Sequence, residues 1–275
     1  PELTADCYPL SALPHVTPLF RDYVLGLAAQ DNDKLQPFYS PFHRNNEWMQ
    51  HPPVMDPSRR QAIADLLQKQ NQNFGAGPAT IANLERLAQG AAAVVTGQQV
   101  GLFGGPLLTL FKAASAIRLA SEASRDGHPH VPVFWLASED HDFDEVNQVT
   151  FHTEHGLETL HLPHNSALGR PVGNLLLGDD ILPLVEDLRR CLGKNPVSEL
   201  LADLYTPSAT FASSFAAFLT RIFSEQGLIV IDAAARPFHA LAQSTLRAAI
   251  ERADEIHAAL LKRSQELERA GYHAQ

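Results

Sequence analysis

Three short runs of apolar residues, at 92–96, 131–136 and 228–232, have the length and composition of strands that are buried on both faces of a sheet. Between the first two runs, apolar residues recur at helical spacing in a segment that Pro106 opens and Gly127 closes. A strand, a helix and a strand in this order predict a parallel βαβ unit, and a long helix is expected from about Arg236. The pattern therefore predicts an α/β fold with a parallel-sheet core.

The rest of the chain is expected to flank or interrupt this core. Asp56 can cap a helix that Pro57 begins, so the N-terminal part contains at least one well-defined helix. The inserted part is predicted to hold two short strands and two helices, at 148–152, 157–162, 181–192 and 209–226. Four segments result: an irregular and helical part of the core, 1–90; the first half of the core, 91–147; an inserted connecting region, 148–226; and the return to the core with the long helix, 227–275.

Composition limits the class of protein. Of the 275 residues, 45% are hydrophobic, which is enough for a substantial core, and the formal net charge of -10 argues against a nucleic-acid-binding surface. The two cysteines, Cys7 and Cys191, form neither a CxxC motif nor a disulfide framework, which indicates a reducing cytosol. No apolar run approaches the ~20 residues that span a bilayer, so we expect a cytoplasmic protein without a membrane partner. We also expect the chain to be part of a longer protein, because no closing element follows its last helix.

The first candidate site is the glycine-rich segment 96–106, TGQQVGLFGGP, between the first strand and its helix. Such a loop lets backbone N–H groups approach an anion, and Lys112 can add a positive charge from the second helical turn. The segment matches neither GxGxxG nor GxxxxGK[ST], so a tight turn that needs glycine only for its conformation remains an alternative. The candidate binding residues are Thr96, Gly97, Gln98, Gln99, Gly101, Gly104, Gly105 and Lys112.

The second candidate site is an acidic cluster, residues 139–145, where five carboxylates and His141 directly follow the second strand. Like charges at this density are expected to raise the carboxyl pKa values and to favour cation binding or acid–base catalysis. His141 can act as a base or a metal ligand, but the cluster lacks a ligand spacing such as HExxH, so no metal ligands are assigned. The alternative is a helix start with Ser138 as its N-cap. The candidates are Asp140, His141 and Asp144 for catalysis, and Ser138 and Glu139 for binding.

A third candidate pair follows the last strand. Asp232 at a strand end can bind a hydroxyl or an amine, and Arg236 can bind a carboxylate or phosphate; a helix cap and a solvated arginine are the alternative. The carboxyl ends of parallel strands meet at one edge of a sheet. We therefore expect Gln98, Asp140 and Asp232 to lie at a common cleft.

Two of these motifs are similar to the signature of the BshC family. The strings are VTGQQVGL at 95–102, followed by GPL at 105–107 and Lys112, and PVFWLASEDHDFDE at 132–145. The resemblance implies a Rossmann-like core, an inserted connecting region and a coiled coil. It also implies a ligase that adds cysteine to glucosaminyl-malate to form bacillithiol, and a homodimer when the chain is complete.

The resemblance leads to specific expectations for the chemistry. Joining a carboxylate to an amine is uphill in water without activation, so ATP with Mg²⁺ is the expected cosubstrate. The glycine-rich segment would hold phosphate or carboxylate, and Asp232 and Arg236 would orient the substrate. Asp140, His141 and Asp144 would bind the amine, act as general base or hold Mg²⁺. Two alternatives stay open: a metal-dependent hydrolase that uses the acidic cluster, and a non-catalytic nucleotide- or thiol-binding module.

Overall fold

The computed structural model describes residues 8–9, 13–29, 35, 37–39, 47–50, 54–153, 156–163 and 169–274. The chain divides into two compact units, Pro53–Gln243 and the combination of Pro1–Pro52 with Ser244–Gln275. Within the described part of the chain, no helix has both the length and the apolar character needed to cross a membrane. Cys7 lies outside the described residues.

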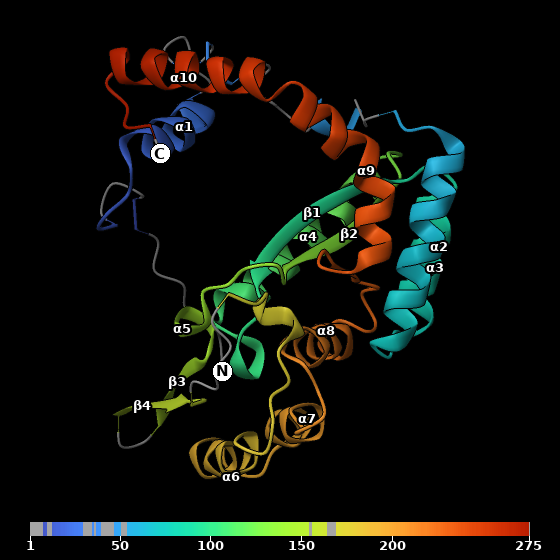
Figure 1. Cartoon of the computed structure of the whole chain (residues 1–275), viewed down its shortest axis with the longest axis vertical. Coiled ribbons are helices and arrows are strands. Elements are labelled where there is room, and N and C mark those ends of the chain that lie inside the picture. The colour runs from blue at the N-terminus through green and yellow to red at the C-terminus, as the bar shows by residue number, and fades with distance from the viewer. Residues whose placement is uncertain are drawn as a thin grey trace. The chain divides into compact units, whose positions relative to one another are not determined.

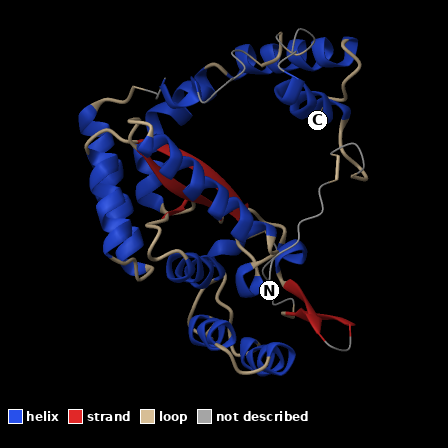
Figure 2. Ribbon diagram, turned by 180° about the vertical axis from the view of Figure 1, so that it is seen from behind, coloured by secondary structure: helices blue, strands red, loops and turns tan. Residues whose placement is uncertain are grey.

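The centre of the first unit is a three-stranded parallel sheet in the order β1 (Ala92–Gln99), β2 (His130–Ala137) and β5 (Ile229–Asp232). Helix α4 (Leu108–Arg125) joins β1 to β2 and crosses one face of the sheet (Figure 2). The predicted parallel βαβ unit and the return of the chain through a third parallel strand are therefore confirmed.

The two faces of the sheet have separate apolar cores. On one face, side chains such as Phe134 and Val230 pack with α4 and with α8 (Phe211–Ile222). On the other face, Val133 and Ile231 pack with α2 (Pro57–Asn73) and α3 (Pro78–Ala88). Side chains that alternate along β2 and β5 thus feed both cores, as expected for strands buried on both faces.

The prediction of burial on both faces is wrong for β1. This strand lies at the edge of the sheet, and Val95 is 57% exposed. The strand is also longer than predicted, because Gly97, Gln98 and Gln99 continue its ladder with β2. The glycine-rich loop therefore begins at Val100 instead of Gly97.

Helix α2 begins as the sequence predicts and then completes the sheet at its other edge. The Asp56 carboxylate accepts hydrogen bonds from the N–H groups of Ser58 and Arg59, which makes it the N-cap. At the far end of α2, the buried Asn71 side chain donates to the Val230 carbonyl and accepts from the Val230 N–H, both at 2.9 Å. The amide of Asn71 thus satisfies the outer edge of β5 in place of another strand.

Replacing Asn71 with alanine is expected to destabilise the protein by about 2 kcal/mol, because it leaves a buried N–H and a buried C=O of β5 without partners. Urea denaturation of the variant measures this loss. The neighbouring exposed Gln72 provides the matched control, since its replacement by alanine should change the unfolding free energy little. Equal effects of the two substitutions would contradict this account of the β5 edge.

The region between β2 and β5 is an insertion, as predicted. It contains α5 (Phe143–Val146), an antiparallel hairpin of β3 (Gln148–Thr153) and β4 (Gly156–His161), η4 (Val172–Asn174), α6 (Ile181–Leu192), α7 (Pro196–Leu204) and α8. The expected helix at 209–226 is shorter, because a capping box of Thr210 and Ser213 sets its start and Ile222 ends it. The sequence prediction missed α7, although Asn195 caps it and Pro196 opens it.

The second unit is built from α1 (Pro18–Ala29), η2 (Glu47–Gln50) and α10 (Ala253–Arg269), together with the end of α9 (Arg236–Glu251) (Figure 1). The Tyr272 hydroxyl donates to the Asp22 carboxylate at 3.0 Å, which joins the C-terminal segment to α1. The prediction of one long helix from Arg236 is wrong, because Arg252 leaves helical geometry at φ -111° and ψ 23°. Asp254 and Glu255 follow in the first turn of α10, where acidic side chains favour a new helix start.

Candidate functional site

The three strands deliver their predicted site residues to one edge of the sheet. The Gln99 side-chain amide donates to the Asp140 carboxylate, which links the end of β1 to the acidic loop after β2. The Ser138 hydroxyl donates to the Asp232 carboxylate at 2.5 Å, which links that loop to the end of β5. The two motifs and Asp232 therefore meet at the carboxyl edge of the sheet, as predicted, but of Gln98, Asp140 and Asp232 only Gln98 lines the cleft described below.

Lys112 faces the glycine-rich segment, as its position in the second turn of α4 predicts. Its ammonium group donates to the Gly97 carbonyl at 3.0 Å and to the Gln98 side-chain oxygen at 2.8 Å. The positive charge is thereby held beside the end of β1. Thr96 lies farther back in the strand, paired with Phe134, and is half-buried.

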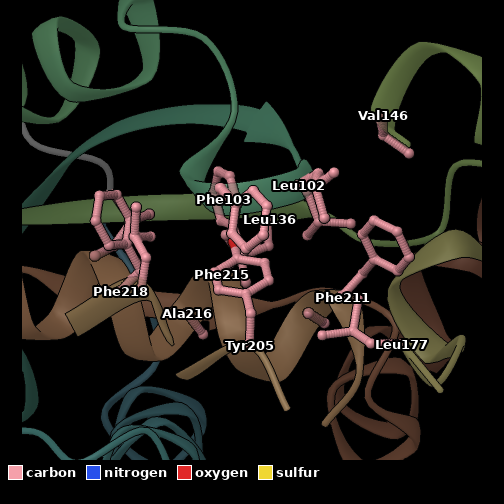
Figure 3. Close-up of a cluster of buried hydrophobic side chains, with 14 of the residues drawn as sticks. Leu102, Phe103, Leu136, Val146, Leu177, Tyr205, Phe211, Phe215, Ala216 and Phe218 are labelled. Carbon is pink, nitrogen blue, oxygen red and sulfur yellow. The ribbon is translucent and has the colours of Figure 1, made fainter. Parts of the chain in front are cut away.

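The turn after β1 is shaped by packing from the insertion. Phe103, Gly104 and Gly105 all have positive φ, within or after η3 (Leu102–Gly104). The N–H of Gly104 donates to the Tyr205 hydroxyl at 2.8 Å, and that hydroxyl donates to the Gly101 carbonyl at 3.1 Å. Figure 3 shows Tyr205 and Phe103 among the aromatic side chains of this core. Burial raises the pKa of Tyr205, so its phenol remains a neutral donor.

This arrangement corrects one part of the anion-cradle hypothesis. The N–H of Gly104 is used by Tyr205 and that of Gly105 by the Leu102 carbonyl at 3.0 Å, so neither points a free donor at a ligand. A Cβ at Gly104 would lie 2.5 Å from a Phe218 ring carbon. These two glycines therefore serve the turn, which is the alternative that the sequence left open for them.

Buried apolar side chains anchor the acidic cluster to the core, and its polar side chains face the solvent. Phe143 and Val146 of α5 are buried, whereas His141, Asp144 and Glu145 are exposed. Helix α5 starts after Asp142, so the alternative with Ser138 as N-cap is wrong; Ser138 is fully buried and bonds Asp232 instead. Asp232 also accepts from the Ala234 N–H at 3.1 Å, so its carboxylate fixes the turn after β5.

Asp140 has a lowered pKa, which corrects the expectation that crowding would raise it. The hydrogen bond from Gln99 is the largest cause, and the N–H of Asp142 is the next. Donors to a carboxylate favour its charged form, and here they outweigh desolvation of the half-buried side chain. Asp140 is therefore an anion at neutral pH.

The acidic loop is also held by η4, a segment of the insertion that the sequence analysis did not single out. The N–H of Val172 donates to the Asp140 carbonyl at 2.7 Å, and the N–H of Gly173 donates to the Ser138 carbonyl at 3.0 Å. A Cβ at Gly173 would lie 2.5 Å from the Ser138 Cβ, so only glycine allows this approach. Neither periodicity nor composition signals these contacts.

Helix α9 adds another partner that the sequence analysis missed. The His239 ring nitrogen lies 2.7 Å from the Glu139 carboxylate, and the Phe238 ring stacks edge-on against Trp135 with centroids 5.3 Å apart. Arg236, at the start of the same helix, is exposed and contributes none of the hydrogen bonds that join the strand ends. Its predicted role at the site therefore stays a prediction.

A cleft of about 350 Å³ lies between the glycine-rich turn and α5. Its volume is at the small end of the range for ligand pockets. Side-chain amides, a glycine-rich backbone and a carboxylate line it: Gln98, Gln99, Gly101, Gly105, Pro106, Glu145, Val146 and Gln148. The cleft thus offers hydrogen-bonding groups of both polarities beside the Lys112 and Asp140 charges.

The acidic side chains turn to different partners, Asp140 to Gln99 and Glu139 to His239. Across the described residues, no three histidine, cysteine, aspartate or glutamate side chains converge on a point where they could together hold a metal ion. The hypothesis of a hydrolase with a metal centre built from this cluster therefore finds no support in its geometry.

Replacing Gln99 with alanine is expected to raise the pKa of Asp140 toward its usual value of 3.8, because the largest stabilising contact of the carboxylate is lost. In the unchanged protein, the lowered pKa stabilises the fold above pH 3.8, and this contribution disappears as the pH falls through the lowered value. Carboxyl NMR titration measures the change. The adjacent Gln98→Ala variant is the control, since Gln98 bonds Lys112; an unshifted Asp140 in Gln99→Ala would disprove the assignment.

Comparison with known proteins gives a consistent result. The family model described as "Bacillithiol biosynthesis BshC, N-terminal Rossmann-like domain" matches residues 4–275. Relatives named "Putative cysteine ligase BshC" occur in Koribacter versatilis (40% identity over 273 residues, 98% of this chain and 50% of the relative) and Solibacter usitatus (40% over 278 residues, 98% and 50%). Another in Salinibacter ruber is 32% identical over 291 residues, covering 100% of this chain and 51% of the relative. The chain spans about half the length of these curated relatives.

Proposed function

Since the chain belongs to the BshC family, we propose that its sheet unit provides the substrate cleft of a ligase that joins cysteine to glucosaminyl-malate and so forms bacillithiol. The observation that carries this proposal is the hydrogen bond between Gln99 and Asp140. It joins the two motifs that resemble the family signature at the edge of the sheet where parallel α/β folds bind ligands. The cleft beside it has room for a small polar substrate.

The charges held beside the cleft by Gln98 and Gln99 suit two kinds of substrate group. Asp140 is ionised at neutral pH, and its lowered pKa makes its carboxylate a weak proton acceptor, so it can serve as the counter-charge of an ammonium group. Lys112, held at Gly97 and Gln98, places a positive charge near a carboxylate or phosphate. Cysteine and glucosaminyl-malate together carry amine and carboxylate groups, which matches this pair of charges.

Amide formation needs an activated carboxylate, and we propose ATP as its source. A cysteine carboxylate oxygen attacks a phosphorus atom of ATP, and pyrophosphate or ADP leaves. The glucosamine nitrogen then attacks the cysteine carbonyl carbon, the C–N bond forms and AMP or phosphate leaves. The proton lost by the amine passes to His141, which is exposed next to Asp140 and can act as general base. Mg²⁺, with Asp144 as its candidate protein ligand, would neutralise the phosphate charge.

Mass spectrometry of the whole polypeptide encoded by the gene, incubated with cysteine, glucosaminyl-malate, ATP and Mg²⁺, tests this proposal. We expect bacillithiol together with an equal amount of AMP or ADP, and no product without ATP. Product formation without nucleotide turnover would refute ATP activation alone. Binding of cysteine or nucleotide without any product would refute the ligase and favour a binding module.

We also propose that the complete protein is a cytoplasmic homodimer that pairs through a coiled coil. Several apolar side chains on α9 and α10 are exposed, which supports a helical partner surface: Leu246, Ile250, Ile256, Leu260 and Leu261. The free thiol of Cys191 is consistent with a reducing compartment. Sedimentation velocity of the whole polypeptide should give a dimer, and a concentration-independent monomer would disprove this part of the proposal.

A further inference from the structure

A second cavity, of about 400 Å³, lies at the amino edge of the sheet, the edge opposite the proposed substrate cleft. It is open to solvent and lined by α3, the end of α4 and the start of β2 at His130. Its polar lining comprises two arginines, a histidine and several amide and hydroxyl side chains: Asn83, Arg86, Ser121, Ser124, Arg125, His130 and Gln226. In a protein with a net charge of -10, this concentration of positive charge is a local exception.

The Arg86 guanidinium is fixed in the wall of the cavity by neutral partners. One terminal nitrogen donates to the Asn83 oxygen at 3.1 Å and the other to the Ser124 hydroxyl at 2.9 Å. Ser124 is itself held by the backbone of His130, donating to its carbonyl at 3.0 Å and accepting from its N–H at 3.1 Å. These two bonds use two of the five N–H donors of arginine, so the group is preorganised and keeps donors for a ligand.

Neither arginine of the cavity has a carboxylate partner within the described part of the chain. Glu122 pairs with Arg118 at 2.8 Å, and Glu85 and Asp126, the acids next to Arg86 and Arg125 in the sequence, form no ion pair with either arginine. The last carbonyls of α4 are capped by the backbone N–H groups of 126–128, so Arg125 is not needed to satisfy them. Two arginines that have no ion-paired carboxylate among the described residues therefore line the same cavity.

We propose that this cavity binds a small oxyanion, a phosphate or a carboxylate, with Arg86 as the fixed anchor and Arg125 as the second, exposed contact. Arginine matches the planar, two-oxygen geometry of these groups. The site is separate from the substrate cleft and does not depend on the proposed ligase activity. It gives the protein a place where an anionic metabolite can bind without competing for the cleft.

Calorimetric titration of the whole polypeptide at constant ionic strength, with inorganic phosphate in one arm and malate in the other, tests the proposal. We expect saturable binding of at least one of them, weakened roughly tenfold or more in Arg125→Gln, which removes one charged contact. Arg86→Gln should weaken binding at least as much. If Arg86→Gln does not fold, the exposed Arg125 still decides the question. The comparison of the two arms identifies the preferred oxyanion.

Two controls separate this site from other causes. Arg247→Gln, which removes a positive charge outside the cavity, should leave the affinity unchanged. Lys112→Gln removes any anion binding at the substrate cleft and should leave the binding that depends on Arg125. Binding that is lost in Lys112→Gln but kept in Arg125→Gln would overturn the proposal, because the anion would then occupy the substrate cleft. Absence of saturable binding in both arms would also overturn it. Loss of ligase activity with intact anion binding would count against the proposed function alone.

Discussion

Replacing Asp140 with asparagine is expected to lower the turnover of the ligase reaction by about 100-fold or more, with His141→Ala having a similar effect. The asparagine keeps the size of the side chain but removes the negative charge that Gln99 and the Asp142 N–H stabilise. An ammonium group of the substrate would then lose its counter-charge, and in the other variant the amine would lose its base. Steady-state kinetics of product formation measures both effects.

Thermal unfolding distinguishes this chemical role from a structural one. Both side chains lie on a surface loop, so their replacement should cost no more than ~1 kcal/mol, comparable to a lost helix cap. Asp142→Asn is the matched control: this neighbouring carboxylate is exposed and makes no capping bond to α5. Near-normal turnover in both Asp140→Asn and His141→Ala would mean that the acidic cluster serves only the local fold.

The fold was predictable where one segment of sequence determines its own structure. The apolar runs of β2 and β5 predicted these strands because parallel strands buried on both faces need apolar residues at successive positions, and the run at 92–96 marked β1 although that strand lies at the sheet edge. Asp56 and Pro57 predicted the start of α2 because capping is a local interaction. The same local logic would have found α7, since Asn195, Pro196 and Ser198 form a capping box with proline at the first helical position.

The site was predictable in position but not in its internal bonding. Strand order alone brings the two motifs to one edge, whereas the lowered pKa of Asp140 depends on Gln99, a residue 41 positions away. The contact between Tyr205 and Gly104 spans 101 positions, and no periodicity reports such a pair. Counting charges in the acidic cluster therefore gave the wrong direction for the pKa of Asp140, because the strongest partner of its carboxylate comes from another strand.

For the glycines too, the sequence predicted where they lie but not which side chains they contact. Gly97 packs against β2, where a Cβ would lie 2.6 Å from the Trp135 carbonyl oxygen, and Gly104 closes against the α8 side chain of Phe218. A glycine-rich segment before a helix suggested N–H donors for an anion, but the structure uses these two glycines for close packing. What remains for a ligand is the edge formed by the Gln98 and Gln99 amides and Gly101.

Substituting Gly104 with alanine should therefore be among the most damaging single changes in the sheet unit, destabilising the protein by about 3 kcal/mol. Gly104 has φ +88°, which costs a residue with a Cβ about 1 kcal/mol, and the added methyl would lie 2.5 Å from the Phe218 ring. Phe218 is only 4% exposed and packs in the aromatic core of Figure 3, so its ring has little space to move away.

The matched control is Gly127→Ala, because Gly127 has almost the same φ, +86°, but no atom lies within 4 Å of its added Cβ. This substitution should destabilise the protein by about 1 kcal/mol, which is the cost of the positive φ without any steric contact. Urea denaturation of both variants isolates the steric contact as the difference between them. Adding Phe218→Leu to Gly104→Ala should recover part of that difference, because the smaller side chain frees the space next to the turn. If Gly104→Ala were no worse than Gly127→Ala, the turn would not be set by its packing against α8, and its two glycine N–H groups would again be candidates for ligand binding.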